Sequence, residues 1–202
     1  MPMKALMVDV DGVVVVHPDP LGWSGTLEAD LGVSPARLQS EFFRPYWNDI
    51  IFGRAGLHER LGPVLAVIAA EVTSHQLTDY WFRNDSQLDH RLLGDLARVR
   101  AEGVALHLAT VQEHQRARYL WNTVGLSERF DAMHYSADLG WAKPSPEFFA
   151  AIEARTSLAP LELFFIDDKA ENVEAARRRG WPAAVWTGHQ GLSALMEQAG
   201  VI

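Results

Sequence analysis

The sequence contains no cysteine in its 202 residues. This absence excludes disulfide bonds, thiolate nucleophiles and zinc sites built on thiolates. Basic residues are also scarce, because 18 lysines and arginines stand against 26 aspartates and glutamates, which gives a formal net charge of −8. Such a charge is not typical of proteins that bind nucleic acid or an anionic membrane. A phosphorylated small molecule is still compatible with it, because a bound divalent cation reverses the local sign of charge.

Long apolar runs are missing as well. The longest ones are far shorter than a helix that spans a bilayer. The chain starts with Met1-Pro2-Met3-Lys4 and then a run of strand length, which is not typical of a signal peptide. We therefore expect a cytoplasmic protein with no membrane partner, either a monomer or a homodimer. Hydrophobic residues make up 48% of the chain, which is enough for a sizeable core.

Strand-like and helix-like patterns alternate over most of the chain. A short apolar run at residues 5–8 predicts a first buried strand. Further strands are predicted at 104–109, 132–135, 163–166 and 183–186, and helices at 88–102, 112–124, 146–155, 169–179 and 192–198. This alternation predicts an α/β fold, a Rossmann-like parallel sheet with helices on both faces.

The segment 17–87 follows a different pattern. It contains no convincing strand, and helices are predicted at 26–31, 35–47, 57–71 and 74–82. Because this segment lies between the first strand and the rest of the sheet, we interpret it as an inserted α-helical cap that covers the strand ends. The predicted core is then formed by residues 1–16 and 88–202.

Polar residues follow several of the predicted strands directly. They are Asp9 and Asp11 after the first strand, Thr110 after the second, and Asp167 and Asp168 after a later one, with Lys143 before Pro144 in a loop between them. A parallel sheet brings the carboxyl ends of its strands to one edge, where ligands bind. We therefore expect these groups to converge although they are far apart in the sequence.

Such a set of side chains suits phosphoryl transfer. Clustered carboxylates cannot all stay ionised without compensation, and all-oxygen ligation suits Mg²⁺. A lysine and a hydroxyl could hold an anionic group beside the metal, and a remaining carboxylate could attack it. An aspartate that forms an acyl-phosphate is a known route for this chemistry.

The four motifs resemble, in order, those of the haloacid dehalogenase-like hydrolase superfamily. These motifs are Asp9-Val10-Asp11-Gly12, Thr110, Lys143-Pro144 and Asp167-Asp168. The helical insert resembles the type 1 cap of that superfamily, so the resemblance covers almost the full length. Residues 135–144 and 164–173 are most similar to small sugar-phosphatase-like members.

The resemblance implies a role for each motif residue. Asp9 would attack phosphorus and also bind Mg²⁺. Asp11 would act as general acid and base, and its backbone carbonyl would contact the metal. Thr110 and Lys143 would hold the phosphoryl oxygens. Asp168 would bind the metal directly, and Asp167 would bind it through water or as a second ligand.

Two positions bear on the reaction. Relatives often carry asparagine where this chain has Val111, so a substrate contact at this substrate-binding position is either missing or supplied by Gln112. Dehalogenases of the superfamily lack an aspartate at the position of Asp11, and only phosphoester cleavage needs a proton delivered to an alkoxide. The resemblance thus implies a Mg²⁺-dependent phosphatase that acts on a small phosphorylated metabolite, for example a sugar phosphate.

Other functions stay open at this point. A phosphotransferase or phosphomutase would use the same intermediate, a 2-haloacid dehalogenase would use the same fold, and a non-catalytic binding module could keep the fold alone. Some residues of the insert could close over a substrate, although tryptophans in such positions are more typical of packing. They are His17, Trp47, Asn48, Arg54, Trp81 and Arg83.

Overall fold

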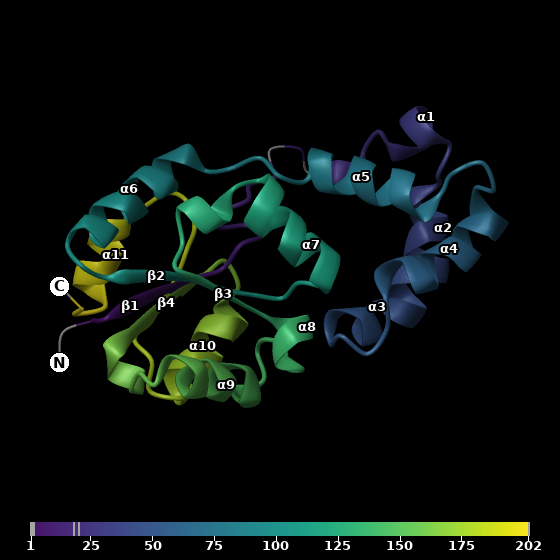
Figure 1. The fold of residues 1–202 in the computed structure, drawn as a ribbon. Coiled ribbons are helices and arrows are strands. Elements are labelled where there is room, and N and C mark those ends of the chain that lie inside the picture. The colour runs from purple at the N-terminus through teal and green to yellow at the C-terminus, as the bar shows by residue number, and fades with distance from the viewer. Residues whose placement is uncertain (1–2, 18, 20, 202) are drawn as a thin grey trace.

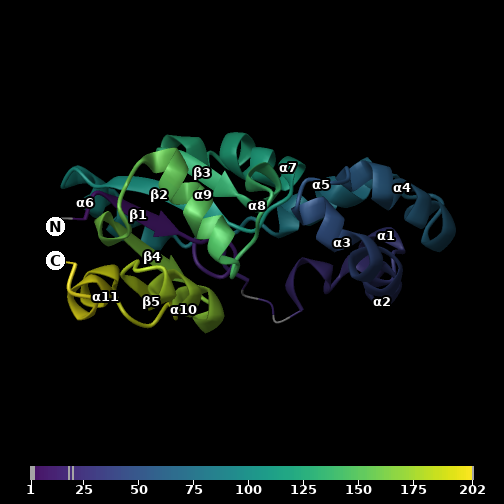
Figure 2. The same ribbon diagram turned by 90° about the horizontal axis from the view of Figure 1, so that it is seen from below.

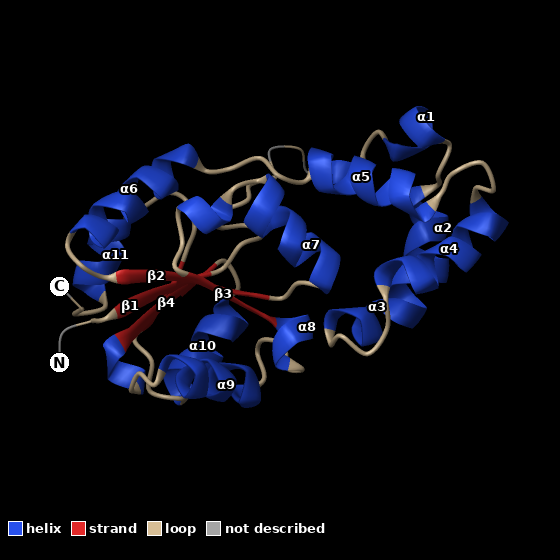
Figure 3. Cartoon of the chain, in the orientation of Figure 1, coloured by secondary structure: helices blue, strands red, loops and turns tan. Residues whose placement is uncertain are grey.

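The first strand of the chain is the centre of the sheet in a computed structural model that describes residues 3–17, 19 and 21–201. Residues 1, 2, 18, 20 and 202, which fall in the predicted core and cap, lie outside this description. Five parallel strands are arranged in the order β3-β2-β1-β4-β5. Figure 3 shows the strands in red and labels β1 to β4. Their bounds are Ala5–Val8 (β1), Ala105–Thr110 (β2), Ala132–Tyr135 (β3), Leu163–Asp167 (β4) and Ala183–Val185 (β5). The predicted α/β class with a Rossmann-like parallel sheet is therefore confirmed.

Helices cover both faces of the sheet, as Figures 1 and 2 show. Successive residues of β1 point to opposite faces, so Leu6 and Val8 join one hydrophobic cluster while Ala5 and Met7 join the other. The first cluster includes side chains of α6 (His90–Ala101) and α11 (Leu192–Gln198). The second includes side chains of α9 (Pro146–Thr156) and α10 (Ala170–Arg178). The remaining core elements are α7 (His114–Arg118), η3 (Tyr119–Thr123), η4 (Leu126–Glu128), α8 (Ser136–Leu139) and η5 (Pro160–Glu162).

Helices between β1 and α6 form a separate body beside the sheet (Figure 1). They are η1 (Gly22–Ser24), α1 (Leu27–Leu31), α2 (Pro35–Leu38), η2 (Gln39–Phe43), α3 (Arg44–Ile51), α4 (Leu57–Ile68) and α5 (Ser74–Asn84). This body has a hydrophobic cluster of its own, centred on buried leucines and aromatic residues. We keep 17–87 as the proposed extent of the cap. No helix in the described part of the chain is both long and apolar enough to cross a bilayer.

Side-chain caps explain where several predicted boundaries were wrong. The helix predicted from residue 88 begins at His90, because Asp89 is its N-cap and accepts a hydrogen bond from the Leu92 amide. The helix predicted from residue 112 begins at His114, because Glu113 caps it. The helix predicted over 57–71 ends at Ile68, since the chain turns there before Thr73 caps the next helix.

A pair of histidines on neighbouring strands makes the core sensitive to acid. The His107 Nδ1 and His134 Nε2 atoms lie 3.1 Å apart, and His134 is only 5% exposed. Burial, reinforced by His107, lowers the pKa of His134 to about 4 from its usual 6.5. The unfolded chain therefore binds more protons than the folded chain between these values, so stability falls as the pH drops from 6.5 towards 4.

We expect His134→Leu to reduce this acid sensitivity. Between pH 7.5 and pH 5, wild type should lose about 2 kcal/mol of unfolding free energy that the variant keeps. Urea unfolding at the two pH values measures the difference. His189→Leu, which removes an exposed histidine, is the control and should behave as wild type. An equal acid loss in His134→Leu and wild type would contradict the assignment.

Candidate active site

The ends of β1 and β4 bring two of the predicted motifs together. Val8 pairs with Ile166 in the parallel register, and the Asp9 amide donates to the Ile166 carbonyl at 3.0 Å. The next residues along the two strands are Asp9 and Asp167, which therefore lie side by side. On the other side of β1, strand β2 ends at Thr110. Strand register thus brings Asp9, Thr110 and Asp167 to the same edge of the sheet.

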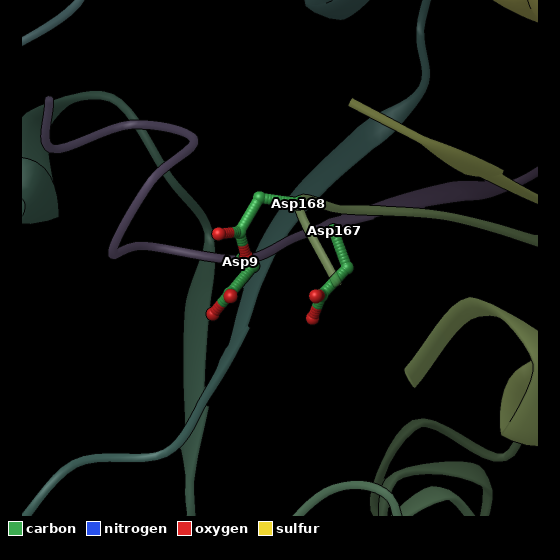
Figure 4. A group of neighbouring side chains, drawn as sticks. All are labelled: Asp9, Asp167 and Asp168. Atoms are coloured by element: carbon green, nitrogen blue, oxygen red, sulfur yellow. The ribbon is translucent and has the colours of Figure 1, made fainter. Parts of the chain in front are cut away.

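Asp9, Asp167 and Asp168 form a compact group of carboxylates (Figure 4). Each offers one oxygen atom, and the three atoms lie within 4.8 Å of one another. Asp167 is fully buried. The side-chain nitrogen Nδ2 of Asn172 donates to both of its oxygens, at 2.9 and 3.0 Å. Asp168 is exposed. The two neighbouring aspartates therefore differ, because Asp167 is held inside the protein while Asp168 faces solvent.

Lys143 lies between the carboxylates, where the loop from α8 to α9 places it. Its Nζ atom is 2.7 Å from Asp9 Oδ1 and 2.5 Å from Asp167 Oδ2, and the side chain is buried. Although burial alone lowers it, the pKa of Lys143 is raised overall by the charges of Asp9 and Asp167. The lysine therefore stays positively charged beside the two acids.

One lysine does not balance the acids of this site. Burial raises the pKa of Asp9 to about 7, and the charge of Asp167 adds to this effect while Lys143 opposes it. Burial also raises the pKa of Asp11, as it does that of Asp168 next to Asp167. A divalent cation would relieve this excess of negative charge, and an all-carboxylate set of donors suits Mg²⁺. The residues present therefore fit such an ion.

Asp11 is oriented by Gln112, a contact that the sequence did not predict. The Gln112 side-chain nitrogen donates to Asp11 Oδ2 at 2.6 Å. The backbone of Gln112 is itself held by the Ser136 hydroxyl, which accepts from its amide and donates to its carbonyl. Asp11 Oδ1 is buried without a hydrogen-bond partner in the described part of the chain. One oxygen of Asp11 is therefore held by Gln112, and the other has no partner among the residues described.

The glycine after Asp11 allows this loop to lie against Asp168. Gly12 has a φ of +79°, and a Cβ atom there would lie 2.5 Å from Asp168 Oδ2. Both the left-handed backbone and the close approach favour glycine. The Asp-Gly pair noted in the sequence thus serves the packing of the site.

Thr110 is buried at the end of β2, and Val111 after it is half-buried. The Thr110 hydroxyl has no hydrogen-bond partner among the residues described. It does not cap the following helix, because Glu113 accepts from the amides at the start of α7. A buried hydroxyl without a partner is uncommon and is consistent with a ligand-binding position.

The cap residues predicted to reach a substrate lie in different surroundings, and Asn48 among them is exposed. Trp47 and Trp81 pack against each other with ring centroids 5.5 Å apart, as the packing interpretation of the tryptophans predicts. Arg54 and Arg83 are exposed. His17 contacts Asp85, which in turn lies beside the buried Arg116, and no sequence pattern pointed to these last two residues.

Comparisons with known proteins agree with this geometry. The family described as haloacid dehalogenase-like hydrolase matches residues 91–185. A phosphorylated carbohydrates phosphatase from Thermotoga maritima is 23% identical over 88% of this chain and 82% of its own length.

Solved structures share the fold. A HAD family enzyme from Bacteroides thetaiotaomicron has a TM-score of 0.81 at 18% identity, over 97% of this chain and 99% of that one. The same enzyme in complex with magnesium and inorganic phosphate has a TM-score of 0.78 at 20% identity, over 96% and 98% of the two chains. An L-2-haloacid dehalogenase from Xanthobacter autotrophicus has a TM-score of 0.64 at 17% identity, over 99% and 84%. The match to the haloacid dehalogenase-like hydrolases therefore covers residues 91–185, and the likeness to the solved structures extends the shared fold to almost the whole chain.

Proposed function

We propose that the protein is a Mg²⁺-dependent phosphatase that hydrolyses a small phosphorylated metabolite through an aspartyl-phosphate intermediate. The observation that carries this proposal is the cluster of three carboxylates, with the Lys143 ammonium 2.7 Å from Asp9. The three residues are Asp9, Asp167 and Asp168. The proposed nucleophile, the proposed cation ligands and a buried positive charge thereby lie within one small region.

Asp9 and Asp168 would hold the metal, with the backbone carbonyl of Asp11. Asp167 would stand outside the set of direct metal ligands, because its oxygens already accept hydrogen bonds from Asn172 and Lys143. When bound, the ion would neutralise charge on the phosphoryl group and on the surrounding acids. Lys143 and the unpartnered hydroxyl of Thr110 would hold phosphoryl oxygens.

In the first half of the reaction an Asp9 carboxylate oxygen attacks phosphorus. The new Asp9–phosphorus bond forms as the bond from phosphorus to the leaving oxygen breaks. Asp11 gives its proton to that oxygen, and its raised pKa suits this role because the acid must be protonated beforehand. The products are an alcohol and the aspartyl phosphate.

Water completes the reaction in the second half. Asp11, now ionised, accepts a proton from water while the water oxygen attacks phosphorus. The Asp9–phosphorus bond breaks, inorganic phosphate leaves, and both aspartates return to their starting states. Gln112 holds Asp11 at 2.6 Å throughout, so that one residue can serve both steps.

We propose a sugar phosphate as the substrate. The Thermotoga maritima relative is named as a phosphatase of phosphorylated carbohydrates. The cap also carries a cavity of about 280 Å³ whose walls include Trp23, Phe43, Trp47 and Trp81. Aromatic faces of this kind suit the apolar face of a sugar ring, and no charged residue lines the cavity among those described.

The presence of Asp11 favours this proposal over a dehalogenase. A 2-haloacid dehalogenase needs no proton at its leaving group, and the dehalogenase neighbour shares only the fold. A binding module has no need of costly clustered carboxylates. A phosphomutase would use the same two aspartates, so it differs from a phosphatase only in the acceptor of the phosphoryl group.

Phosphate release tests the proposal directly. We expect release from an aryl phosphate and from some members of a panel of sugar phosphates in Mg²⁺, and no release after EDTA treatment. Isomerised sugar phosphate without free phosphate would instead indicate a mutase, and chloride release from 2-chloro acids would indicate a dehalogenase. Unchanged hydrolysis in EDTA would exclude the metal from the reaction.

A further inference from the structure

A buried arginine on the core holds the end of the cap. Arg116 of α7 is 2% exposed, and its Nη1 atom donates to the Phe82 carbonyl at 3.1 Å and to the Ser86 hydroxyl at 3.0 Å. Its Nη2 atom donates to the Asp85 carbonyl. Phe82 belongs to the last turn of α5, whereas Ser86 and Asp85 belong to the exit linker, residues 85–89, which leads to α6. A guanidinium at the carboxyl end of a helix is favoured by the helix dipole as well as by the hydrogen bonds.

The side chain of Asp85 joins this arginine to the other linker. Asp85 is 9% exposed, and its Oδ2 atom lies 3.5 Å from Arg116 Nη2 and accepts a hydrogen bond from Trp81 Nε1 at 3.0 Å. Its Oδ1 atom lies 3.0 Å from Nδ1 of His17, which is on the entry linker between β1 and η1. One carboxylate therefore contacts the entering linker, a cap helix and the core.

The two linkers also pair with each other beside the catalytic loop. The Val16 amide donates to the Gln87 carbonyl at 2.8 Å, and the Asp89 amide donates to the Val14 carbonyl at 2.9 Å. Further towards Asp11, the Gly12 amide donates to the Val15 carbonyl at 2.8 Å. The loop of Asp11, both linkers and α7 thus form one continuous hydrogen-bonded unit.

We propose that Arg116, Asp85 and His17 form a latch, a set of positioning residues. The latch fixes the orientation of the cap relative to the site that contains Asp9 and Asp11. None of the three is needed for the two chemical steps, yet two of them are buried ions, which persist in a fold only when paired. The latch stands where the cap would pivot, so its contacts set the orientation of the cap cavity relative to the site.

Substitutions that remove single contacts test the latch. We would compare His17→Ala, Asp85→Asn and Arg116→Met with Arg118→Met, a control that removes an exposed arginine from the same helix. Because Arg116→Met leaves Asp85 buried without its cation, the double variant Arg116→Met/Asp85→Asn, which removes both charges, is measured beside it.

Amide hydrogen exchange is the primary readout, since it needs no substrate. We expect the linker amides of Val16 and Asp89 to exchange at least about tenfold faster in the latch variants, while amides of β1 and β4 keep their protection. Arg118→Met should exchange as wild type. Unchanged linker protection in every latch variant, or an equal loss over the whole chain in His17→Ala, would overturn the proposal.

Activity gives a second readout that rests on the proposed function. We expect kcat/KM for a sugar phosphate to fall about tenfold more than kcat/KM for a small aryl phosphate, because only the sugar needs the cap. An equal fall for both substrates would contradict a positioning role. If wild type released no phosphate at all, the proposed function would fail, and the exchange measurement would still decide on the latch.

Discussion

Replacing Asp9 with asparagine is expected to reduce phosphate release by at least about 10⁴-fold. The amide cannot form the bond to phosphorus on which both halves of the reaction depend. The loss should appear in kcat for the aryl phosphate and for every sugar phosphate alike, because the nucleophile is common to all substrates. Steady-state phosphate release with saturating Mg²⁺ measures it.

Folding and trapping experiments show whether the Asp9→Asn loss is chemical. Asparagine has almost the same shape, and Lys143 keeps its contact with Asp167, so the unfolding transition should stay close to that of wild type. Asp138→Asn, which changes an exposed acid on α8, should keep full activity. Rapid acid quenching should detect the aspartyl phosphate in wild type and none in Asp9→Asn. Substantial release by the variant would refute the nucleophile assignment.

Replacing Lys143 with methionine is expected to reduce both stability and activity. Asp9 and Asp167 would lose their shared positive charge inside the protein, and breaking a buried ion pair in this way costs about 3–5 kcal/mol. Phosphate release should become hardly detectable, because the same ammonium group would hold the phosphoryl oxygens. Urea unfolding in EDTA and phosphate release in Mg²⁺ measure the two effects.

The loss of unfolding free energy in Lys143→Met should depend on pH with a definite sign. Without the lysine, the pKa of Asp9, already raised to about 7, would rise further in the folded protein. The folded chain would then hold a proton that the unfolded chain releases above the usual pKa of 3.8. Wild-type Asp9 is also protonated in the folded protein below about pH 7, so the further rise adds to the stability deficit of the variant only as the pH increases above that value.

Lys4→Met provides the matched control for this substitution. Lys4 pairs with Glu162 at 2.7 Å, but its side chain is 57% exposed. Such surface pairs contribute about 0–1 kcal/mol, so this variant should be nearly as stable as wild type and fully active. If Lys143→Met matched Lys4→Met in stability or kept its activity, the pairing of Lys143 with the two acids would have no energetic importance.

Local sequence pattern determined the framework of this protein. Apolar runs bounded by turn residues predict strands and helices without any knowledge of distant contacts, and the predicted strand at 132–135 and helix at 192–198 match β3 and α11. The order of the acidic and basic motifs was enough to indicate a candidate site, because every parallel strand ends at the same edge.

Only the tertiary structure decided how the side chains of the site are held. Gln112 lies 101 positions from Asp11, and Lys143 lies 24 from Asp167, so no spacing within one helix or strand could predict these contacts. The burial of Arg116 beside Asp85 depends likewise on the path of two linkers. Sequence pattern reports which face of an element is apolar, whereas the pairing of buried polar groups is set by the packing of elements against one another.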